Sequence, residues 1–263
     1  MNRITDYHEL KTKIVNWIKN YAVTNNIESL VVGVSGGIDS AVVSTLCAET
    51  GLKTYVLSMP LLSKIDSDKL SDSHTKVLEK KYNNVTRIRV DLSGVYDKFI
   101  HSLNWWTDSS EYINNELANA NTKSRLRMVT LYQIAGTVGG IVVGTGNKVE
   151  DYGIGFYTKY GDGGVDIAPI ADLYKTEVWE LGKHLGVDQR IIDAQPTDGL
   201  WDDGRTDEDQ IGTSCAMLEW VMEQGLTKDP MFLNEEQIQA IKNYKKFNTQ
   251  NQHKMNSIPT FKL

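Results

Sequence analysis

The chain has 263 residues, 40% of them hydrophobic and 24% charged, which is ordinary for a globular protein and predicts one α/β domain with a sizeable core. Its formal net charge of −6 argues against a nucleic-acid partner, because binding to a phosphate backbone normally needs a basic face. No apolar run approaches the length of a membrane span, which argues against a membrane partner.

The first 21 residues predict an amphipathic helix rather than a signal peptide. Their apolar side chains recur at helical spacing and are Leu10, Ile14, Trp17, Ile18 and Tyr21. The two cysteines, Cys47 and Cys215, lie in apolar helical patterns, and no cysteine or histidine cluster suggests zinc. We therefore expect reduced core thiols in a cytoplasmic protein.

The most informative stretch covers residues 30–40 and reads LVVGVSGGIDS. Its apolar start predicts a buried parallel strand, its two glycines predict a turn that a ligand can approach closely, and Ala41–Ala48 has a helical pattern. This arrangement gathers backbone N–H groups at the positive end of a helix dipole, which favours a phosphate ligand. No lysine of the GxxxxGK(S/T) type is present, and Asp39 instead indicates a bridging Mg²⁺. The alternative is an ordinary strand-to-helix turn with Asp39 near the cap.

Four strand patterns alternate with segments of helical periodicity. The strands are predicted at Leu30–Val34, Thr54–Ser58, Val85–Val90 and Gly140–Val143. This alternation predicts an α/β fold with a doubly wound parallel sheet and helices on both faces. Ligands of such sheets lie beyond the carboxyl ends of the strands, which is where Ser35, Met59, Asp91 and the segment 144–147 follow the four strands.

The second half of the chain contains three further predicted features. A long helix is expected over Tyr112–Thr137, and the glycine-rich segment Gly144–Gly164 is expected to be a functional loop. Thr206 is a predicted N-cap of a helix that Gly225 would close. The tail after Asn243 is basic and polar.

Residues 144–172 read GTGNKVEDYGIGFYTKYGDGGVDIAPIAD. Together with the SGGIDS loop, they closely resemble the NAD synthetases, a family of N-type ATP pyrophosphatases. The resemblance covers roughly residues 10–215 and returns near His253. It implies the adenine-nucleotide α-hydrolase-like fold and a homodimer. The implied reaction makes NAD from deamido-NAD, ATP and ammonia through an adenylated carboxylate, and it releases AMP and pyrophosphate.

The same resemblance assigns roles residue by residue. It implies ATP binding by Gly33, Val34, Ser35, Gly36, Gly37, Ile38, Asp39, Ser40, Thr145, Lys175 and Thr197. It implies deamido-NAD binding by Arg125, Lys159, Asp166, His253 and Lys254. It implies Mg²⁺ binding by Asp39 and Glu150, and catalytic roles for Asp39, Lys175 and Asp166, the last as a proton acceptor. The spacing from Glu150 to GFYTK is one residue longer than in some relatives, so Asp151 stays open as the second metal ligand.

Several alternatives stay open at this stage. Arg125 could pair with an acid on a surface helix, and Lys175 could be a surface lysine at a helix start. We expect a single NAD synthetase domain over residues 1–263 without a glutaminase domain, so ammonia would come from solution or from another chain. The substrate could instead be nicotinate mononucleotide. A non-catalytic nucleotide-binding protein of the same fold is the remaining alternative.

Overall fold

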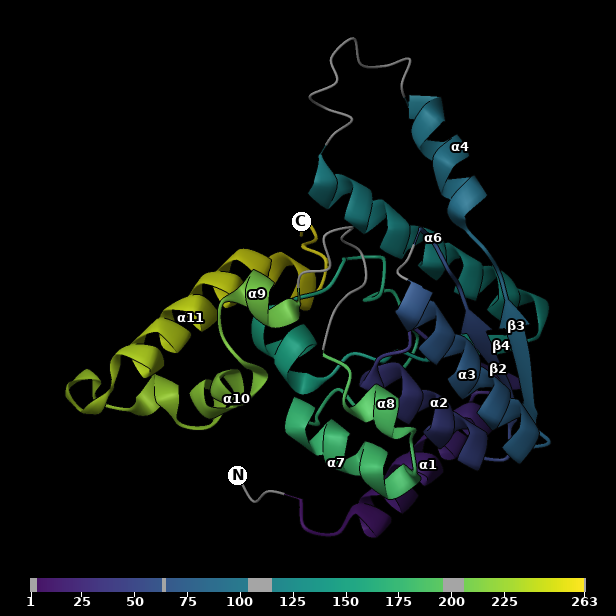
Figure 1. Ribbon diagram of the computed structural model, residues 1–263, viewed down its shortest axis with the longest axis horizontal. Helices are drawn as coiled ribbons and strands as arrows, with labels where there is room; N and C mark the ends of the chain where they lie inside the picture. The colour runs from purple at the N-terminus through teal and green to yellow at the C-terminus, as the bar shows by residue number, and fades with distance from the viewer. Residues whose placement is uncertain (1–3, 63–64, 104–114, 196–205, 263) are drawn as a thin grey trace.

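The computed structural model describes residues 4–62, 65–103, 115–195 and 206–262, which form an α/β fold around a parallel sheet (Figure 1). The strand order is β3-β2-β1-β4, and all neighbouring strands run parallel. The strands are β1 (Ser29–Gly33), β2 (Lys53–Ser58), β3 (Val85–Arg89) and β4 (Gly140–Val142). These bounds confirm the four predicted strands to within one residue at each end. The strand order reverses between β1 and β4, which is the point where ligands bind in open α/β sheets.

Helices cover both faces of the sheet, which confirms the doubly wound prediction. Successive side chains of a strand point to opposite faces, so Leu30 and Val32 enter one core and Val31 enters the other. The helices on the first face are α1 (Tyr7–Thr24), α2 (Ile38–Glu49), α3 (Ile65–Lys81) and α7 (Lys175–Leu185). Those on the second face are α4 (Ser93–Leu103) and α6 (Glu116–Thr137). Both faces of the central strands β1 and β2 are therefore buried, whereas β3 at the edge of the sheet is partly exposed.

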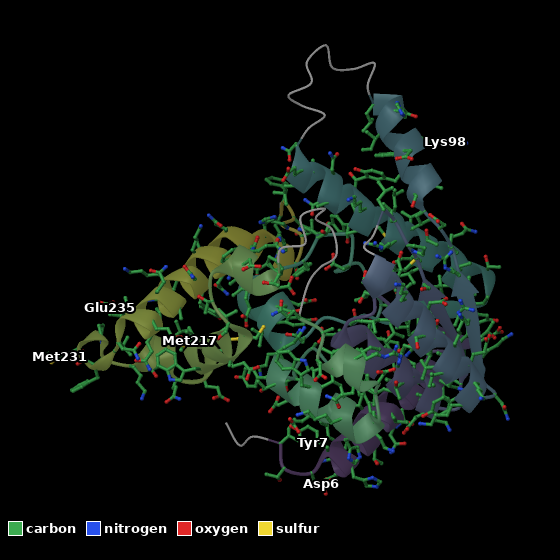
Figure 2. All side chains as sticks on the ribbon, viewed as in Figure 1. Asp6, Tyr7, Lys98, Met217, Met231 and Glu235 are labelled. Atoms are coloured by element: carbon green, nitrogen blue, oxygen red, sulfur yellow. The ribbon has the colours of Figure 1, made fainter. Side chains whose placement is uncertain are left out.

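The predicted N-terminal amphipathic helix is α1. Asp6 caps it by accepting a hydrogen bond of 2.8 Å from the backbone N–H of Glu9 (Figure 2). Ile14 and Ile18 are buried against the first face, whereas Trp17 is 47% exposed. The helical spacing therefore identified the element, and the sheet selected which part of its apolar stripe is buried.

The predicted long helix over Tyr112–Thr137 corresponds to α6, and positions 112–114 of that prediction lie outside the described residues. Asn115 has an extended backbone and accepts a hydrogen bond from the backbone N–H of Ala118, so α6 begins at Glu116. An Asn at this position satisfies an N–H group that the helix leaves without a partner, and this capping sets the boundary. The end of the helix at Thr137 is as predicted.

A second, smaller core lies beside the sheet and holds the C-terminal elements (Figure 1). These elements are the π-helix η2 (Lys148–Ile154), α9 (Asp207–Ile211), α10 (Cys215–Glu223), η3 (Gly225–Thr227), η4 (Pro230–Phe232) and α11 (Glu235–Met255). The short helix α8 (Gln189–Ile192) instead places Ile191 in the core of the first face. Side chains of η2, α9 and α10 pack together there, with α11 against them. Met231 and Glu235 mark the outer end of the α10 and α11 pair (Figure 2).

The helix predicted to run from Thr206 to Gly225 was half right. Thr206 is the N-cap of α9, as predicted. The helix nevertheless ends at Ile211, because Gly212 takes a left-handed backbone with φ +72°. Ser214 then caps a separate helix, α10, so the closing glycine is Gly212 and not Gly225.

Two further predictions concern the cysteines and membrane-spanning helices. Cys47 and Cys215 are buried free thiols, as expected. In the part of the chain that the structure describes, no helix combines the length and the apolarity needed to cross a bilayer.

Candidate active site

A cavity of about 550 Å³ lies at the carboxyl ends of β1 and β4. Its lining includes all residues of the loop 33–40, and also Thr145, Gly146, Glu150, Asp151, Asp162 and Lys175. The structure therefore brings together the predicted ATP-binding residues from three separate parts of the sequence. Thr197 lies outside the described residues.

The glycine loop is shaped for close approach by an anion. Gly36 has a φ of +96°, and a Cβ there would lie 2.5 Å from the carbonyl oxygen of Ser67, so only glycine fits without strain. Ser40 accepts a hydrogen bond of 3.1 Å from the backbone N–H of Ser35, which ties the loop to the first turn of α2. Gly37 is the N-cap of α2 and has no side chain to cap it. The N–H groups and positive dipole of this helix start are therefore directed to the cavity edge.

Three charged side chains meet inside the cavity. Lys175 Nζ lies 2.5 Å from Asp39 Oδ2 and 2.9 Å from Glu150 Oε1. Lys175 is 2% exposed, so the ion pairs are shielded from water. Burial opposes the charge of this ammonium, but the two carboxylates outweigh burial and hold the pKa of Lys175 well above its usual value.

Glu150 reaches this cluster from the π-helix η2. Asn147, the N-cap of η2, is fully buried and donates hydrogen bonds to Glu150 Oε2 at 2.9 Å and to Asp39 Oδ1 at 3.3 Å. Burial raises the pKa of Glu150, and Lys175 opposes that rise. A π-helix takes up one extra residue within a helical turn, which accounts for the longer spacing to GFYTK noted in the sequence.

Asp151 also lies at the cavity, but with different neighbours. A Cβ at Gly146 would come 1.8 Å from Asp151 Oδ2, so the carboxylate rests where only a glycine leaves room. Burial raises the pKa of Asp151 well above its usual value, and the nearby charge of Asp162 adds to the effect. Of the two adjacent acids, Glu150 is the one that shares partners with Asp39.

Lys175 is held at the start of α7 by contacts from a distant helix. Glu219 of α10 accepts hydrogen bonds from the backbone N–H of Thr176 at 2.8 Å and from its hydroxyl at 2.7 Å. Glu219 is 1% exposed, so this carboxylate is buried against the positive end of α7. Glu177 completes the helix start by accepting from the backbone N–H of Tyr174.

None of the five predicted deamido-NAD residues lines the cavity, and contacts between α6, the segment after η2 and α11 connect four of them, Arg125, Lys159, His253 and Lys254. Arg125 donates to the backbone carbonyl of Lys159, and Lys159 donates to that of His253. Lys254 Nζ donates to the carbonyls of Gly155 and Tyr157. In this structure these cations therefore bind backbone carbonyls and connect α6 and α11 to the segment after η2.

Asp166 is also held by hydrogen bonds within the protein. Its carboxylate accepts hydrogen bonds from the backbone N–H of Val142 at 2.7 Å and from the hydroxyl of Tyr132 at 3.1 Å. Asp162 is the carboxylate of this segment that lines the cavity, and it accepts from Ser124 Oγ at 2.7 Å. Asp162, which the sequence analysis did not assign to the site, therefore lines the cavity, whereas Asp166 does not.

Sequence reasoning missed four residues of this region: Arg127, Asn147, Asp162 and Glu219. Arg127 lines the cavity and donates to the carbonyl of Met59, which follows β2. The sequence offered a signal for Met59 alone, because residues after the carboxyl ends of parallel strands meet at one edge of the sheet, whereas Arg127 lies within α6. Asn147 and Asp162 belong to motifs already singled out, whereas Glu219 had no sequence signal at all.

Comparison with known proteins agrees with this geometry. A sequence model described as NAD synthase matches residues 10–261. The chain belongs to the NAD synthase family. It is 34% identical over 262 residues to an NH(3)-dependent NAD(+) synthetase of Methanosarcina acetivorans, covering 98% of this chain and 99% of that one. It is 40% identical over 208 residues to the synthetase of the same description from Carboxydothermus hydrogenoformans, covering 79% and 82%.

Two solved structures are also similar to the chain. The structure of NMN synthetase from Francisella tularensis has a TM-score of 0.86 and 30% identity, covering 99% of this chain and 100% of that one. An NH3-dependent NAD synthetase from Campylobacter jejuni has a TM-score of 0.74 and 25% identity, covering 98% and 100%. Both structures match nearly the whole of this chain.

Proposed function

We propose that this protein is an ammonia-dependent NAD synthetase that converts deamido-NAD, ATP and ammonia to NAD, AMP and pyrophosphate. The observation that carries the proposal is the buried contact of Lys175 with Asp39 and Glu150 beside the glycine loop. Backbone N–H groups, a lysine and two carboxylates are what adenylyl transfer from ATP requires. Their convergence in one cavity also argues against a non-catalytic nucleotide-binding protein.

The metal of this site is proposed to be Mg²⁺, held by Asp39 and Glu150. Both ligands supply hard oxygen atoms, which Mg²⁺ prefers. Among the described residues no group of three or more His, Cys, Asp and Glu side chains forms a complete metal site. Two carboxylates leave further coordination positions to phosphate oxygens and water, as is usual for Mg²⁺ bound with a nucleotide. When bound, the ion supplies positive charge beside the ATP phosphates.

The residues of the chain perform the remaining work. The carboxylate of the nicotinate ring is a poor electrophile, and transfer of AMP to it turns the leaving group into a phosphate ester. The loop 35–37 and the N-terminus of α2 bind the phosphates. Lys175 turns from the carboxylates to the pyrophosphate that leaves, where negative charge develops. Ammonia then attacks the carbonyl carbon.

A proton must leave the attacking ammonia, and a carboxylate is proposed to accept it. Asp166 is the predicted acceptor, and its carboxylate binds Val142 and Tyr132 in this structure. Asp162 lines the cavity. Asparagine substitutions at the two positions, compared by their pH profiles of kcat, separate the roles.

A second candidate reaction is amidation of nicotinate mononucleotide. The similarity to the NMN synthetase of Francisella tularensis, with its TM-score of 0.86 and 30% identity, favours it. The two substrates carry the same nicotinate carboxylate, so the adenylation chemistry is shared. They differ in the second nucleotide, which the Arg125 and Lys159 region is proposed to bind in the dinucleotide.

A homodimer in the cytoplasm is also proposed. Exposed apolar side chains on α4 and α6 support an association between two copies, because a second copy could cover apolar surface that the monomer leaves exposed to water. These side chains are Val95, Phe99, Leu103, Leu117 and Val129. Sedimentation equilibrium of the wild-type protein and of a Val129→Glu variant tests the proposal.

The decisive experiment measures pyrophosphate release with ATP, Mg²⁺ and ammonium. Three parallel reactions contain deamido-NAD, nicotinate mononucleotide, or neither. We expect release with deamido-NAD at a kcat/KM well above that with the mononucleotide, and none without a nicotinate substrate. The opposite ratio supports the second candidate, and no release in any reaction refutes both. Glutamine freed of ammonium should not replace ammonium.

A further inference from the structure

Asn147 has every hydrogen-bonding group of its side chain in use. Its Oδ1 accepts from the backbone N–H of Val149 at 3.0 Å and from that of Glu150 at 3.1 Å. Its Nδ2 donates to Glu150 Oε2 at 2.9 Å and to Asp39 Oδ1 at 3.3 Å. An amide has two donor hydrogens and two acceptor lone pairs, so none is left over. The backbone N–H groups also dictate its orientation, because only the oxygen can face them and only the nitrogen can face carboxylates.

Asn147 and Lys175 bind opposite oxygens of the same two carboxylates. Lys175 takes Asp39 Oδ2 and Glu150 Oε1, whereas Asn147 takes Asp39 Oδ1 and Glu150 Oε2. The four side chains therefore form a closed ring in which two acids alternate with two donors. The donors keep two like charges side by side in a site with little water.

The two donors differ in how firmly they are held. Lys175 reaches the ring through a long side chain with rotatable bonds, and the proposed reaction requires it to contact phosphate. Asn147 is fully buried, and its oxygen is bound to the first turn of η2. When Lys175 turns away, Asn147 is the part of the ring that stays in place.

We propose that Asn147 is a positioning residue, which sets the separation and orientation of the Asp39 and Glu150 carboxylates that receive the divalent cation. The proposal rests on the proposed function, since that function makes this pair the metal ligands. Groups that hydrogen-bond to metal ligands commonly change metal affinity or activity 10- to 100-fold, roughly, when they are removed. Asn147 is the N-cap of η2, the element that carries Glu150. The same side chain therefore caps the helix and positions the carboxylates.

The test separates these two roles of Asn147 by substitution. Asn147→Ser keeps a side-chain oxygen that can cap η2 but removes the NH₂ group that bridges the acids. The matched control is Asn248→Ser, because Asn248 Nδ2 donates to the carbonyl of Gly153 in the same π-helix and binds neither carboxylate in the described contacts. Binding of Mn²⁺ is measured by electron paramagnetic resonance with α,β-methylene-ATP, which cannot be cleaved at the α–β bond.

For Asn147→Ser we expect the Kd for Mn²⁺ to rise about 10- to 100-fold and the KM for Mg²⁺ to rise by a similar factor. The control should change each by less than about twofold. If the folded Ser variant binds Mn²⁺ as wild type does, the proposal is overturned. Because this titration needs no nicotinate substrate, it can succeed even where the proposed amidation reaction fails.

A second variant covers the outcome in which Asn147→Ser does not fold. Asn147→Thr fills more of the asparagine volume than serine does and is still an N-cap, but its one hydroxyl hydrogen cannot bridge the two acids. We expect thermal unfolding near that of wild type and a kcat at saturating Mg²⁺ at least about tenfold lower. A wild-type kcat together with a wild-type KM for Mg²⁺ in this variant shows that Asn147 only caps the helix.

Discussion

The ammonium of Lys175 lies 2.5 Å from the carboxylate of Asp39, which stands 136 residues earlier in the chain. With Glu150 on its other side, this ammonium is placed as an internal cation between the two proposed metal ligands. A buried pair of carboxylates is costly without positive charge, and Lys175 supplies it in the absence of a metal ion. A divalent cation at the proposed site would therefore compete with Lys175 for the same two acids.

Replacing Lys175 with methionine should reveal this competition. Lys175→Met leaves two buried carboxylates without their cation, which should destabilise the metal-free protein by about 3–5 kcal/mol, the usual cost of breaking a buried ion pair. Added Mg²⁺ should raise the Tm of the variant more than that of wild type, and kcat should collapse. Differential scanning calorimetry in EDTA and in Mg²⁺ measures both effects on Tm. The control is Lys183→Met, an exposed lysine of the same helix. Equal responses to Mg²⁺ in variant and wild type contradict the competition.

Replacing Asp39 with asparagine should nearly abolish turnover while the fold stays intact. The substitution removes one charged ligand for the cation but keeps an oxygen that can accept from Asn147. We expect kcat to fall roughly a hundredfold or more, since a metal ion supplies several kcal/mol of transition-state stabilisation. Steady-state kinetics measures the loss of turnover, and far-ultraviolet circular dichroism checks that the fold is intact. Turnover near that of wild type in Mg²⁺ would show that Asp39 is not a metal ligand.

Replacing Arg125 with alanine should affect the dinucleotide and not ATP. Its guanidinium is exposed and contacts the carbonyl of Lys159, so the contact that it loses is small for stability. Loss of one charge-assisted hydrogen bond to deamido-NAD, about 1–3 kcal/mol, should raise the KM for deamido-NAD by roughly 5- to 150-fold. Initial rates at varied deamido-NAD and at varied ATP measure the two KM values. If the first KM is unchanged, Arg125 does not bind this substrate.

Replacing Glu219 with alanine should weaken the start of α7. The buried carboxylate accepts two hydrogen bonds from Thr176, the residue next to Lys175. Their loss should cost about 2–3 kcal/mol in the free energy of unfolding, and kcat should fall because the position of Lys175 becomes less defined. Urea unfolding and kinetics are compared with Glu180→Ala, an exposed acid of α7. Equal stability of the two variants rules out a role for Glu219 in holding the helix.

The stability of the protein should decrease as pH falls from about 6.5 to about 4. Burial lowers the pKa of His74 from 6.5 to about 4, and His74 is bound to Ser44. In this window the unfolded chain binds a proton that the folded protein excludes, so the contribution of His74, about 3 kcal/mol, is present above pH 6.5 and lost as pH falls. Urea unfolding at pH 7 and pH 5 should show a smaller loss for His74→Gln than for wild type. The exposed His101, changed to Gln, should behave as wild type.

Patterns within short stretches of sequence determined much of this protein. Apolar runs predicted β1, β2 and β4, because a parallel strand covered on both faces is apolar on both, whereas β3, which reads VTRIR at the edge of the sheet, was predicted from its β-branched residues. The two glycines before Asp39 predicted the phosphate loop, because a backbone with φ of +96° at Gly36 needs glycine. The Thr206 cap was also local, since the residue that accepts the N–H hydrogen bond is only three positions from its partner.

Other features depended on residues that are distant in sequence. Glu219 has no pattern of its own and became recognisable only when α10 packed against the start of α7. The bridge from Asn147 to Asp39 spans 108 residues, and Arg127 binds a carbonyl 68 residues away. Local propensity carries no information about such partners, because the parallel sheet brings the ends of separate strands to one edge. The sequence by itself thus identified the loop, the strands and most of the acids and bases, and only the tertiary structure decided which of them touch.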